Sequence, residues 1–416
     1  MYMITKKKRY VVKSSADVLK SVDSFCNYYR LIKEYIEKGK IRSSLDRGAF
    51  ALPQFILKGK FLSLLGSGRN SMSYAYGPEM GDIHIRTKII DLENARYQTS
   101  YSPDHVAVVP GAWSGVEFVI EELVNLKKGK TRPMTLAVIG PTHYQMFHRA
   151  INVYGVNVVG YDFIFPGEGS TPRTKQEIDE ILASRPSAVF LANPNNPNGE
   201  YFPPEILRYL IQTAQKRKIY VIVDEIQDFL SAKDKGLRYG KWIQSANVIR
   251  VDSFSKKRGI SEYRIGWVIA PKEILGDRLC GVIGRMSGLM GNAPRAANTA
   301  IAAILDADLQ RVYTGKNAFG PVERSLRKRE DAIHKRLAKM HGVEILPREA
   351  CINITIKVRA PYTDMQLAKK LMDEGTLIMP CAGYGYDPKD GVMRITFAER
   401  WKKIDHSMSA LSRVLR

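Results

Sequence analysis

The chain has 416 residues, of which 44% are hydrophobic and 25% are charged, and these proportions are typical of a globular protein with a large core. No apolar run approaches the roughly 20 residues that a membrane-spanning helix needs. The basic residues 1–9 precede only a short apolar run, Tyr10 to Val12, so a signal peptide is not predicted. We expect a soluble, cytoplasmic protein that has no membrane partner.

The net charge of +22 is the most unusual property of the composition. A surplus of this size suits nucleic acid, a membrane surface or an acidic ligand. The basic residues are dispersed, however, and aromatic residues do not alternate with them as they do in a surface that stacks bases. We therefore expect no nucleic-acid partner, and the charge only weakly favours an acidic or phosphorylated substrate. The basic clusters are residues 6–9, 38–42, 127–132, 216–218 and 324–339.

The cysteines and histidines give no sign of a metal site. The four cysteines form no CxxC pair, and the seven histidines form no HExxH motif. Scattered cysteines of this kind are typical of free thiols in a reducing compartment.

In chain order, the first predicted element is a helix over residues 18–40, whose apolar residues recur at helical spacing. Residues 53–80 lack such a pattern and are rich in Gly, Ser and Tyr. From residue 105 onward, short runs rich in Val and Ile alternate with helical segments, a pattern typical of a parallel sheet buried on both faces. The runs predict seven strands, at residues 105–109, 135–139, 157–161, 188–192, 219–223, 248–251 and 264–269, with helices such as 115–125 and 204–216 between them.

The last hundred residues predict a second, smaller unit. Residues 320–341 are charged and helix-prone, residues 351–358 and 392–397 are strand-like, and residues 362–374 are helix-like. The predicted fold class is α/β: a large domain with a mostly parallel seven-stranded sheet covered by helices, and a smaller α+β domain built from both ends of the chain. The predicted ranges are 1–75 for an N-terminal segment with part of the small domain, 76–320 for the large domain and 321–416 for the C-terminal small domain.

The segment from Ser253 to Arg264 contains the most informative motif. Lys256 follows a predicted strand, the hydroxyls of Ser253 and Ser255 precede it, and Arg264 comes eight residues later. A lysine that forms an imine needs surroundings that disfavour its charged form. A phosphate needs hydroxyls, backbone N–H groups and a guanidinium. The segment meets both needs; the alternatives are an exposed basic loop and the adjacent Lys257 as the reactive lysine.

Two further motifs follow predicted strands of the same sheet. Asp224 comes after the apolar run 221–223, at the carboxyl end of a strand, where open α/β sheets place their sites. Capping of a following helix is the alternative role for this aspartate. The string NPNNPNG at residues 193–199 comes after the run 188–192 and reads by itself as a rigid turn.

Two motifs provide groups that bind anions. Gly111, Ala112 and Trp113 open a predicted helix, whose N-terminus suits a phosphate, and Gly111 lets the backbone come close. A plain strand-to-helix turn is the alternative. Arg394 lies in the apolar run 391–397, where an unpaired guanidinium is costly and a carboxylate is a suitable partner. A buried structural salt bridge is the alternative there.

Together with the loop YGPEMG at residues 76–81, these motifs occur in the order and near the spacing of a known family. The chain resembles the aminotransferase class I/II family of fold-type-I, pyridoxal-phosphate-dependent enzymes, the aspartate-aminotransferase-like superfamily. The resemblance runs from Tyr76 to Phe397 and so covers roughly four-fifths of the chain.

The resemblance implies a role for each motif. Lys256 would form a Schiff base with pyridoxal 5'-phosphate (PLP) and move the substrate's Cα proton, and Asp224 would pair with the ring nitrogen. Arg394 would bind the substrate's α-carboxylate. Tyr76 would reach the phosphate of the neighbouring subunit, which implies a homodimer with shared active sites. The other implied cofactor-binding residues are Gly111, Ala112, Trp113, His143, Asn196, Gln227, Ser253, Ser255 and Arg264, and Asn196 is also implied to contact the substrate.

The chain departs from the family pattern at three positions. Gln227 replaces the usual tyrosine that donates to the ring oxygen, and an amide donates a hydrogen bond but does not ionise. His143 stands where an aromatic ring normally stacks on the cofactor, with Tyr144 as an alternative stacking residue. Asn198 replaces a threonine.

The predicted function is amino-group transfer between an L-amino acid and a 2-oxo acid. Because the cofactor shell is altered, a PLP-dependent lyase, cyclase, decarboxylase or oxidase acting on a specialised amino acid is the alternative. A ligand-sensing or nucleic-acid-binding protein built on this fold is a third hypothesis, suggested by the charge alone.

Overall fold

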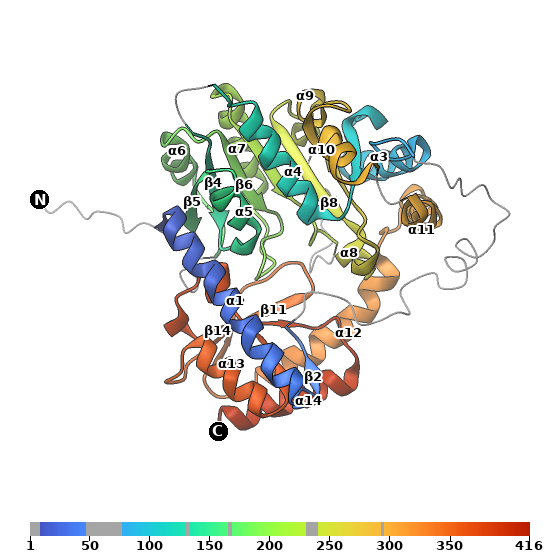
Figure 1. The fold of residues 1–416 in the computed structure, drawn as a ribbon. Coiled ribbons are helices and arrows are strands. Elements are labelled where there is room, and N and C mark those ends of the chain that lie inside the picture. Colours follow the sequence, from blue (N-terminus) through green and yellow to red (C-terminus); the bar gives the residue numbers. More distant parts are fainter. Residues whose placement is uncertain (1–8, 47–76, 130–132, 165–168, 230–239, 293–294) are drawn as a thin grey trace, which may run out of the picture.

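The computed structural model describes residues 9–46, 77–129, 133–164, 169–229, 240–292 and 295–416 (Figure 1). Tyr76 and most of the segment 53–80 lie outside the described residues. The predicted contact of Tyr76 with a neighbouring subunit therefore stays a prediction.

An eight-stranded sheet forms the larger part of the protein (Figure 1). Its strands are β1 (Val11–Lys13), β3 (Val106–Val109), β4 (Thr135–Gly140), β5 (Asn157–Asp162), β6 (Ala188–Ala192), β7 (Tyr220–Asp224), β8 (Val248–Ser253) and β9 (Gly266–Ile269). They lie in the order β1-β5-β4-β6-β7-β8-β9-β3. The five strands from β5 to β8 are mutually parallel, whereas β1 pairs antiparallel with β5, β9 with β8, and β3 with β9.

The mostly parallel sheet and its seven predicted strands are confirmed, each within two residues of the predicted bounds. The predicted strand count was one too low, because β1 joins the sheet at its edge. Three residues are too few to show a periodic pattern, so the pairing of β1 depends on the exposed edge of β5 rather than on a signal in its own sequence.

Helices cover both faces of this sheet, and alternate residues of each strand face opposite layers (Figure 1). Leu136 and Val138 of β4 pack in one hydrophobic core, and Ala137 and Ile139 pack in the other. The first core includes residues of α4 (Ala112–Asn125), α5 (His148–Asn152) and α10 (Gly281–Met290), and the second includes residues of α6 (Lys175–Ala183) and α7 (Pro204–Lys216). The remaining helices beside this sheet are α3 (Ile83–Tyr97), α8 (Phe254–Lys257), α9 (Lys272–Leu275) and α11 (Arg295–Tyr313).

A second unit packs below the large sheet in Figure 1. Its antiparallel sheet has the order β10-β11-β14-β13, with β10 (Val343–Ile345), β11 (Asn353–Val358), β14 (Val392–Thr396) and β13 (Met379–Pro380). A parallel pair, β12 (Thr376–Leu377) with β2 (Ser43–Ser44), accompanies helices α12 (Gly320–Leu337), α13 (Asp364–Asp373) and α14 (Trp401–Val414). The predicted strands and helices of this unit are present.

Helix α1 (Ser15–Glu37) connects the two units, since it packs against β5 of the large sheet and against α13 of the small one (Figure 1). Its start is defined by a capping box in which Ser14 and Asp17 exchange hydrogen bonds. The N-terminal part of the chain thus supplies a strand to each unit, β1 to the large one and β2 to the small one. The predicted domain boundaries stay a prediction.

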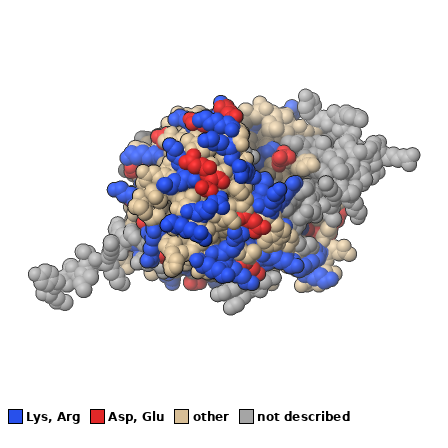
Figure 2. All heavy atoms as spheres, turned by 90° about the horizontal axis from the view of Figure 1, so that it is seen from below, with Lys and Arg blue, Asp and Glu red and all other residues tan. Residues whose placement is uncertain are grey.

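Basic side chains are spread over the face shown in Figure 2, with acidic side chains among them. In the small unit, Arg336 pairs with Asp405 at 2.8 Å and Arg413 pairs with Glu374 at 2.7 Å. Within the described ranges, no helix is long and apolar enough to cross a bilayer, and no group of three or more His, Cys, Asp or Glu residues is placed to hold a metal ion. The cytoplasmic location and the absence of a nucleic-acid partner stay predictions.

A buried ion network holds the carboxyl end of β7 in place. Arg250 of β8 is 1% exposed, and its Nε donates to both carboxylate oxygens of Glu225, at 3.0 and 3.1 Å. Its Nη2 donates to Glu225 at 2.7 Å and to Glu93 of α3 at 2.5 Å. Since Glu225 directly follows Asp224, the network connects the end of β7 to both β8 and α3.

We expect Arg250→Met to lower the free energy of unfolding by about 3–5 kcal/mol, because it leaves Glu225 buried without its cation and leaves Glu93 with Arg96 alone. The matched change Arg336→Met breaks an exposed pair with Asp405 and should cost under about 1 kcal/mol. Urea unfolding followed by circular dichroism measures both. Equal losses in the two variants would contradict a structural role for the buried network.

Candidate active site

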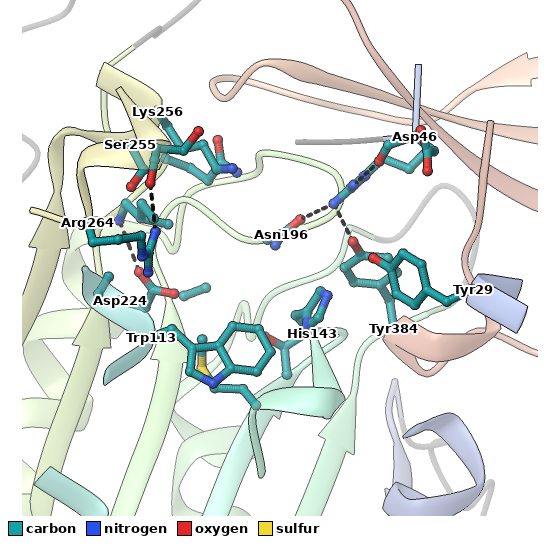
Figure 3. Close-up of a pocket in the computed structure, with 18 residues that line it drawn as sticks. Tyr29, Asp46, Trp113, His143, Asn196, Asp224, Ser255, Lys256, Arg264 and Tyr384 are labelled. Carbon is teal, nitrogen blue, oxygen red and sulfur yellow. Dashed lines mark hydrogen bonds between the residues drawn. The ribbon is translucent and has the colours of Figure 1, made fainter. Parts of the chain in front are cut away.

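A cavity of about 310 Å³ lies at the carboxyl ends of β6, β7 and β8, between the large sheet and the small unit (Figure 3). Parallel strands end at a common edge of the sheet, so residues far apart in the sequence meet there. Ten of the predicted site residues line this cavity: Ala112, Trp113, His143, Asn196, Asp224, Gln227, Ser255, Lys256, Arg264 and Arg394. Gly111 and Ser253 do not line it. They are the N-cap residues of α4 and α8, the helices that carry lining residues.

Lys256 points into the cavity from the short helix α8, directly after β8 (Figure 3). Burial lowers the pKa of its amine to about 8, and the positive charges of Arg394 and Arg264 act in the same direction. The adjacent Lys257 points to the opposite side of α8, where it is 1% exposed and forms an ion pair with Asp252. The structure therefore separates the two lysines that the sequence left as rivals.

Asp224, the last residue of β7, lines the cavity on the same side as Lys256 (Figure 3). Burial raises the pKa of this carboxyl to about 6, although the backbone N–H of Ile226 donates to Oδ1 at 3.0 Å. A carboxylate with so few compensating partners favours an N–H donor or a positive charge in the cavity. The neighbouring Gln227 is 2% exposed, and its Oε1 has no hydrogen-bond partner among the described residues.

The N-terminus of α4 and the guanidinium of Arg264 form one corner of the cavity. Gly111 is the N-cap residue of α4 with a φ of +83°, and a Cβ added there would lie 2.8 Å from Cζ of Arg264. Arg264 donates to the backbone carbonyls of Ser261 at 3.0 Å and Pro110 at 3.2 Å. Free backbone N–H groups beside a guanidinium are suited to a phosphate.

Two serines near this corner have different surroundings. Ser255 lines the cavity, whereas the Ser253 hydroxyl is fully buried and accepts a hydrogen bond from the backbone N–H of Ser255 at 3.2 Å. Ser253 thus caps α8 and holds the helix that carries Lys256.

His143 presents an aromatic face to the cavity. Its ring stacks on Phe25 with centroids 4.3 Å apart, and Tyr384 and Trp113 contact its edges at 5.3 and 5.4 Å. Burial, followed by the charge of Arg394, lowers the pKa of His143 to about 3, so the imidazole is neutral at physiological pH. Tyr144 lies outside the cavity lining and donates its hydroxyl to Asp162, so His143 and not Tyr144 faces the cavity.

Arg394 of β14 closes the other side of the cavity. It is 5% exposed, its Nη2 donates to the backbone carbonyl of Asp46 at 2.6 Å, and its Nη1 donates to Oδ1 of Asn196 at 3.4 Å and to the hydroxyl of Tyr384. Its Nε has no hydrogen-bond partner among the described residues. The guanidinium is therefore held rigidly while retaining a free donor for a ligand.

Figure 3 shows these groups on two opposite sides. Lys256, Ser255, Arg264 and Asp224 lie on the side of the large sheet, and Tyr29, Asp46 and Tyr384 lie on the side of the small unit. Arg394 belongs to the second group, since it donates to Tyr384 and to Asp46. Asn196 lies between the two sides.

Sequence reasoning missed the cavity residues that come from weakly patterned segments. Tyr29 belongs to a predicted helix and appeared there only as an apolar position, and Asp46 follows a strand of two residues. Tyr384 lies between the predicted helix 362–374 and the predicted strand 392–397. The other lining residues without a predicted role are Thr142, Met146, Ala192, Ile226 and Ser261.

Comparison with known proteins places the chain in a family. The family model described as aminotransferase class I and II matches residues 52–411. An aspartate aminotransferase of Thermotoga maritima is 25% identical over 344 residues, which are 82% of this chain and 82% of that protein. An S-alkyl-thiohydroximate lyase of Arabidopsis thaliana is 25% identical over 73% of this chain and 63% of that protein.

Solved structures agree on the fold. An alanine aminotransferase from Pyrococcus furiosus superposes with a TM-score of 0.77 over 97% of this chain and 99% of that chain, at 20% sequence identity. At this identity the likeness concerns the fold alone. The extent of the family match decides the family: the chain belongs to aminotransferase class I and II, and it is an enzyme of the PLP-dependent aminotransferase type.

Proposed function

We propose that this cavity holds PLP on Lys256 and transfers an amino group between an L-amino acid and a 2-oxo acid. One observation carries the proposal: a buried lysine amine of lowered pKa shares a single cavity with a buried carboxyl, Asp224, and two guanidinium groups, Arg264 and Arg394. Perturbed titratable groups that meet in a cavity are typical of active sites.

The residues present fit the chemistry of PLP. Gly111 lets the Arg264 guanidinium lie directly against the start of α4, because a Cβ there would meet the guanidinium, and an anion could bind both groups. Asp224 provides a carboxyl placed to pair with a ring N–H. The side-chain amide of Gln227 lines the cavity and has N–H groups that could donate to the ring oxygen.

When bound, PLP supplies an aldehyde that condenses with amines and a ring that accepts the electron pair released from the substrate's Cα–H bond. Arg264, Ser255 and the N-terminus of α4 would hold the phosphate. Asp224 would keep a proton on the ring nitrogen, and Asn196 and Gln227 would contact the ring oxygen by their amide groups. His143 would cover one face of the ring as a neutral imidazole.

Arg394 would bind the substrate carboxylate through its free Nε and its outer edge, because Asp46, Asn196 and Tyr384 already fix its orientation. Lys256 would take the Cα proton as a neutral amine and return it to the cofactor carbon. A pKa of about 8 suits this task, since the amine can both accept and release a proton near neutral pH.

The wider assignment follows from the family. We infer a homodimer in the cytoplasm, in which Tyr76 reaches the phosphate of the neighbouring subunit. Tyr76 lies outside the described residues, so this assignment depends on the family motif at residues 76–81.

A PLP-dependent lyase is the second candidate, favoured by Gln227 and His143 at positions where the family usually has other residues. The two reactions are separated by absorbance spectra of the holoenzyme mixed with amino acids. Transamination leaves the cofactor in its amine form, whereas a lyase regenerates the lysine-bound form and releases a shortened product that mass spectrometry detects.

The covalent link is tested by borohydride reduction. We expect PLP to be fixed on the peptide that contains Lys256, and Lys256→Ala to lose both this adduct and at least about 10³-fold in turnover. Lys257→Met is the matched variant, and it should keep the adduct because Lys257 faces away from the cavity. Peptide mapping of the unchanged protein separates the two lysines if the second variant does not fold. An adduct at Lys257 alone would refute the assignment.

The pH dependence follows from the direction of the pKa shift. Only the neutral amine condenses with an aldehyde, so the rate of PLP capture by cofactor-free protein should rise with pH and level off above about 8. Arg394→Gln removes a nearby positive charge, which raises the pKa of Lys256 and should move this midpoint to higher pH. Stopped-flow absorbance measures both proteins, and the comparison cancels the titration of PLP itself. An unchanged midpoint would contradict the electrostatic coupling.

The phosphate corner is tested at Gly111. Gly111→Ala places a methyl group against Arg264 and should weaken PLP binding by about tenfold or more, as measured by spectral titration. Gly129→Ala is the matched control, because Gly129 has a similar φ of +77° but no atom within 4 Å of an added Cβ. Equal PLP affinities in the two variants would show that backbone strain rather than the lost space is responsible.

A further inference from the structure

One charged group of the cavity has no task in the proposed function. Among the residues that the structure describes, five lining side chains carry a formal charge: Lys256, Arg264 and Arg394 are cations, and Asp224 and Asp46 are anions. Arg264 would face the cofactor phosphate, Asp224 the ring nitrogen, and Arg394 the substrate carboxylate. The carboxylate of Asp46 remains without a counter-charge.

The surroundings of Asp46 are those of a binding group. The residue is 1% exposed and lines the cavity beside Arg394 (Figure 3). Its Oδ1 accepts a hydrogen bond from the Ser44 hydroxyl, and its Oδ2 has no hydrogen-bond partner among the described residues. Arg394 contacts the backbone carbonyl of Asp46 and not its carboxylate. A buried carboxylate oxygen without a partner is costly, so a ligand that donates to it gains binding energy.

Aromatic rings next to Asp46 add to this preference. Tyr29 and Tyr384 lie on the same side of the cavity in Figure 3. Aromatic faces attract cations by their quadrupole. The ring of Tyr384 already contacts Arg394, whose Cζ lies 5.1 Å from the ring centroid. The unpaired carboxylate and the ring of Tyr29 are therefore the features of this wall that favour a ligand's positive charge, in contrast to the acidic substrate that the net charge of the chain suggested.

We propose that Asp46 selects substrates whose side chain ends in an ammonium or another cationic nitrogen donor. This inference rests on the proposed function and names its substrate class: amino acids with a basic side chain. The α-carboxylate binds Arg394, and the cationic end of the side chain donates to Oδ2 of Asp46.

Support of Arg394 by the field of Asp46 is the competing explanation, since this charge also acts on the guanidinium. The two roles differ in what they predict for ligands. A supporting role affects every carboxylate ligand equally, whereas a selecting role affects only ligands that carry the second, positive group. Asp46→Asn separates them, because it keeps the backbone carbonyl that Arg394 contacts.

Binding is measured on the holoenzyme by calorimetry with pairs whose tertiary amines cannot form an imine with PLP: 4-(dimethylamino)butanoate and 5-methylhexanoate, 5-(dimethylamino)pentanoate and 6-methylheptanoate, 6-(dimethylamino)hexanoate and 7-methyloctanoate. We expect at least one amino-bearing acid to bind about tenfold or more tightly than its neutral partner. Asp46→Asn should reduce this ratio to nearly one while changing the affinity of the neutral acid less than about threefold. Asp23→Asn, an equal charge change at an exposed position of α1, should leave the ratio unchanged.

Three results would overturn the inference: no preference at any chain length, a preference that survives in Asp46→Asn, or an equal loss for both members of each pair. The last result would assign Asp46 to the support of Arg394.

Steady-state kinetics with L-ornithine against L-norvaline, and with L-lysine against L-norleucine, distinguish this inference from the proposed function. Turnover of amino acids without a preference for the basic member defeats the inference alone. Selective binding of the amino-bearing acids without turnover of any amino acid defeats the proposed reaction and leaves the assignment of Asp46 in place.

Discussion

The burial of the Lys256 amine beside two guanidinium groups is the constraint on which the rest of the site depends. An ammonium in this cavity loses hydration and is repelled by Arg394 and Arg264, and only Asp224 offsets these effects. The neutral amine is therefore accessible near physiological pH. The same positive potential attracts the anionic groups that the proposed function requires, a phosphate at one end of the cavity and a carboxylate at the other.

The fold divides these tasks between its two units. The large sheet supplies Lys256, Asp224 and Arg264 at strand ends that are fixed by backbone pairing on both sides. The small unit supplies Arg394 from β14, and the chain leading out of β2 supplies Asp46. The residues proposed to bind the cofactor and those proposed to bind the substrate consequently come from different sheets, which share one hydrophobic core.

Buried ion pairs keep the two sides of α8 distinct. Lys257 forms an ion pair with Asp252, while Lys256 has no carboxylate in contact within the described part of the chain. Arg250 similarly engages Glu225 and Glu93 and so leaves Asp224, the preceding residue, unpaired by any cation in contact. In both places the neighbouring charged residues are paired with each other. Lys256 and Asp224 therefore keep perturbed pKa values.

The sequence by itself determined seven strands of the large sheet, several helices of each unit and the family, because Val- and Ile-rich runs and collinear motifs are local signals. It did not predict α3 or α14. It also indicated ten of the residues that meet in the cavity. It favoured Lys256 over Lys257 by the spacing to Arg264, and His143 over Tyr144 by the resemblance. The tertiary structure shows which residue of each pair lines the cavity, since adjacent residues are turned in different directions by packing. It missed strand β1, which has three residues, and Asp46, which follows the two-residue strand β2. Both are placed by partners more than 140 residues away in the sequence. Such long-range contacts leave no periodic trace in a short segment, so only the tertiary structure could assign them.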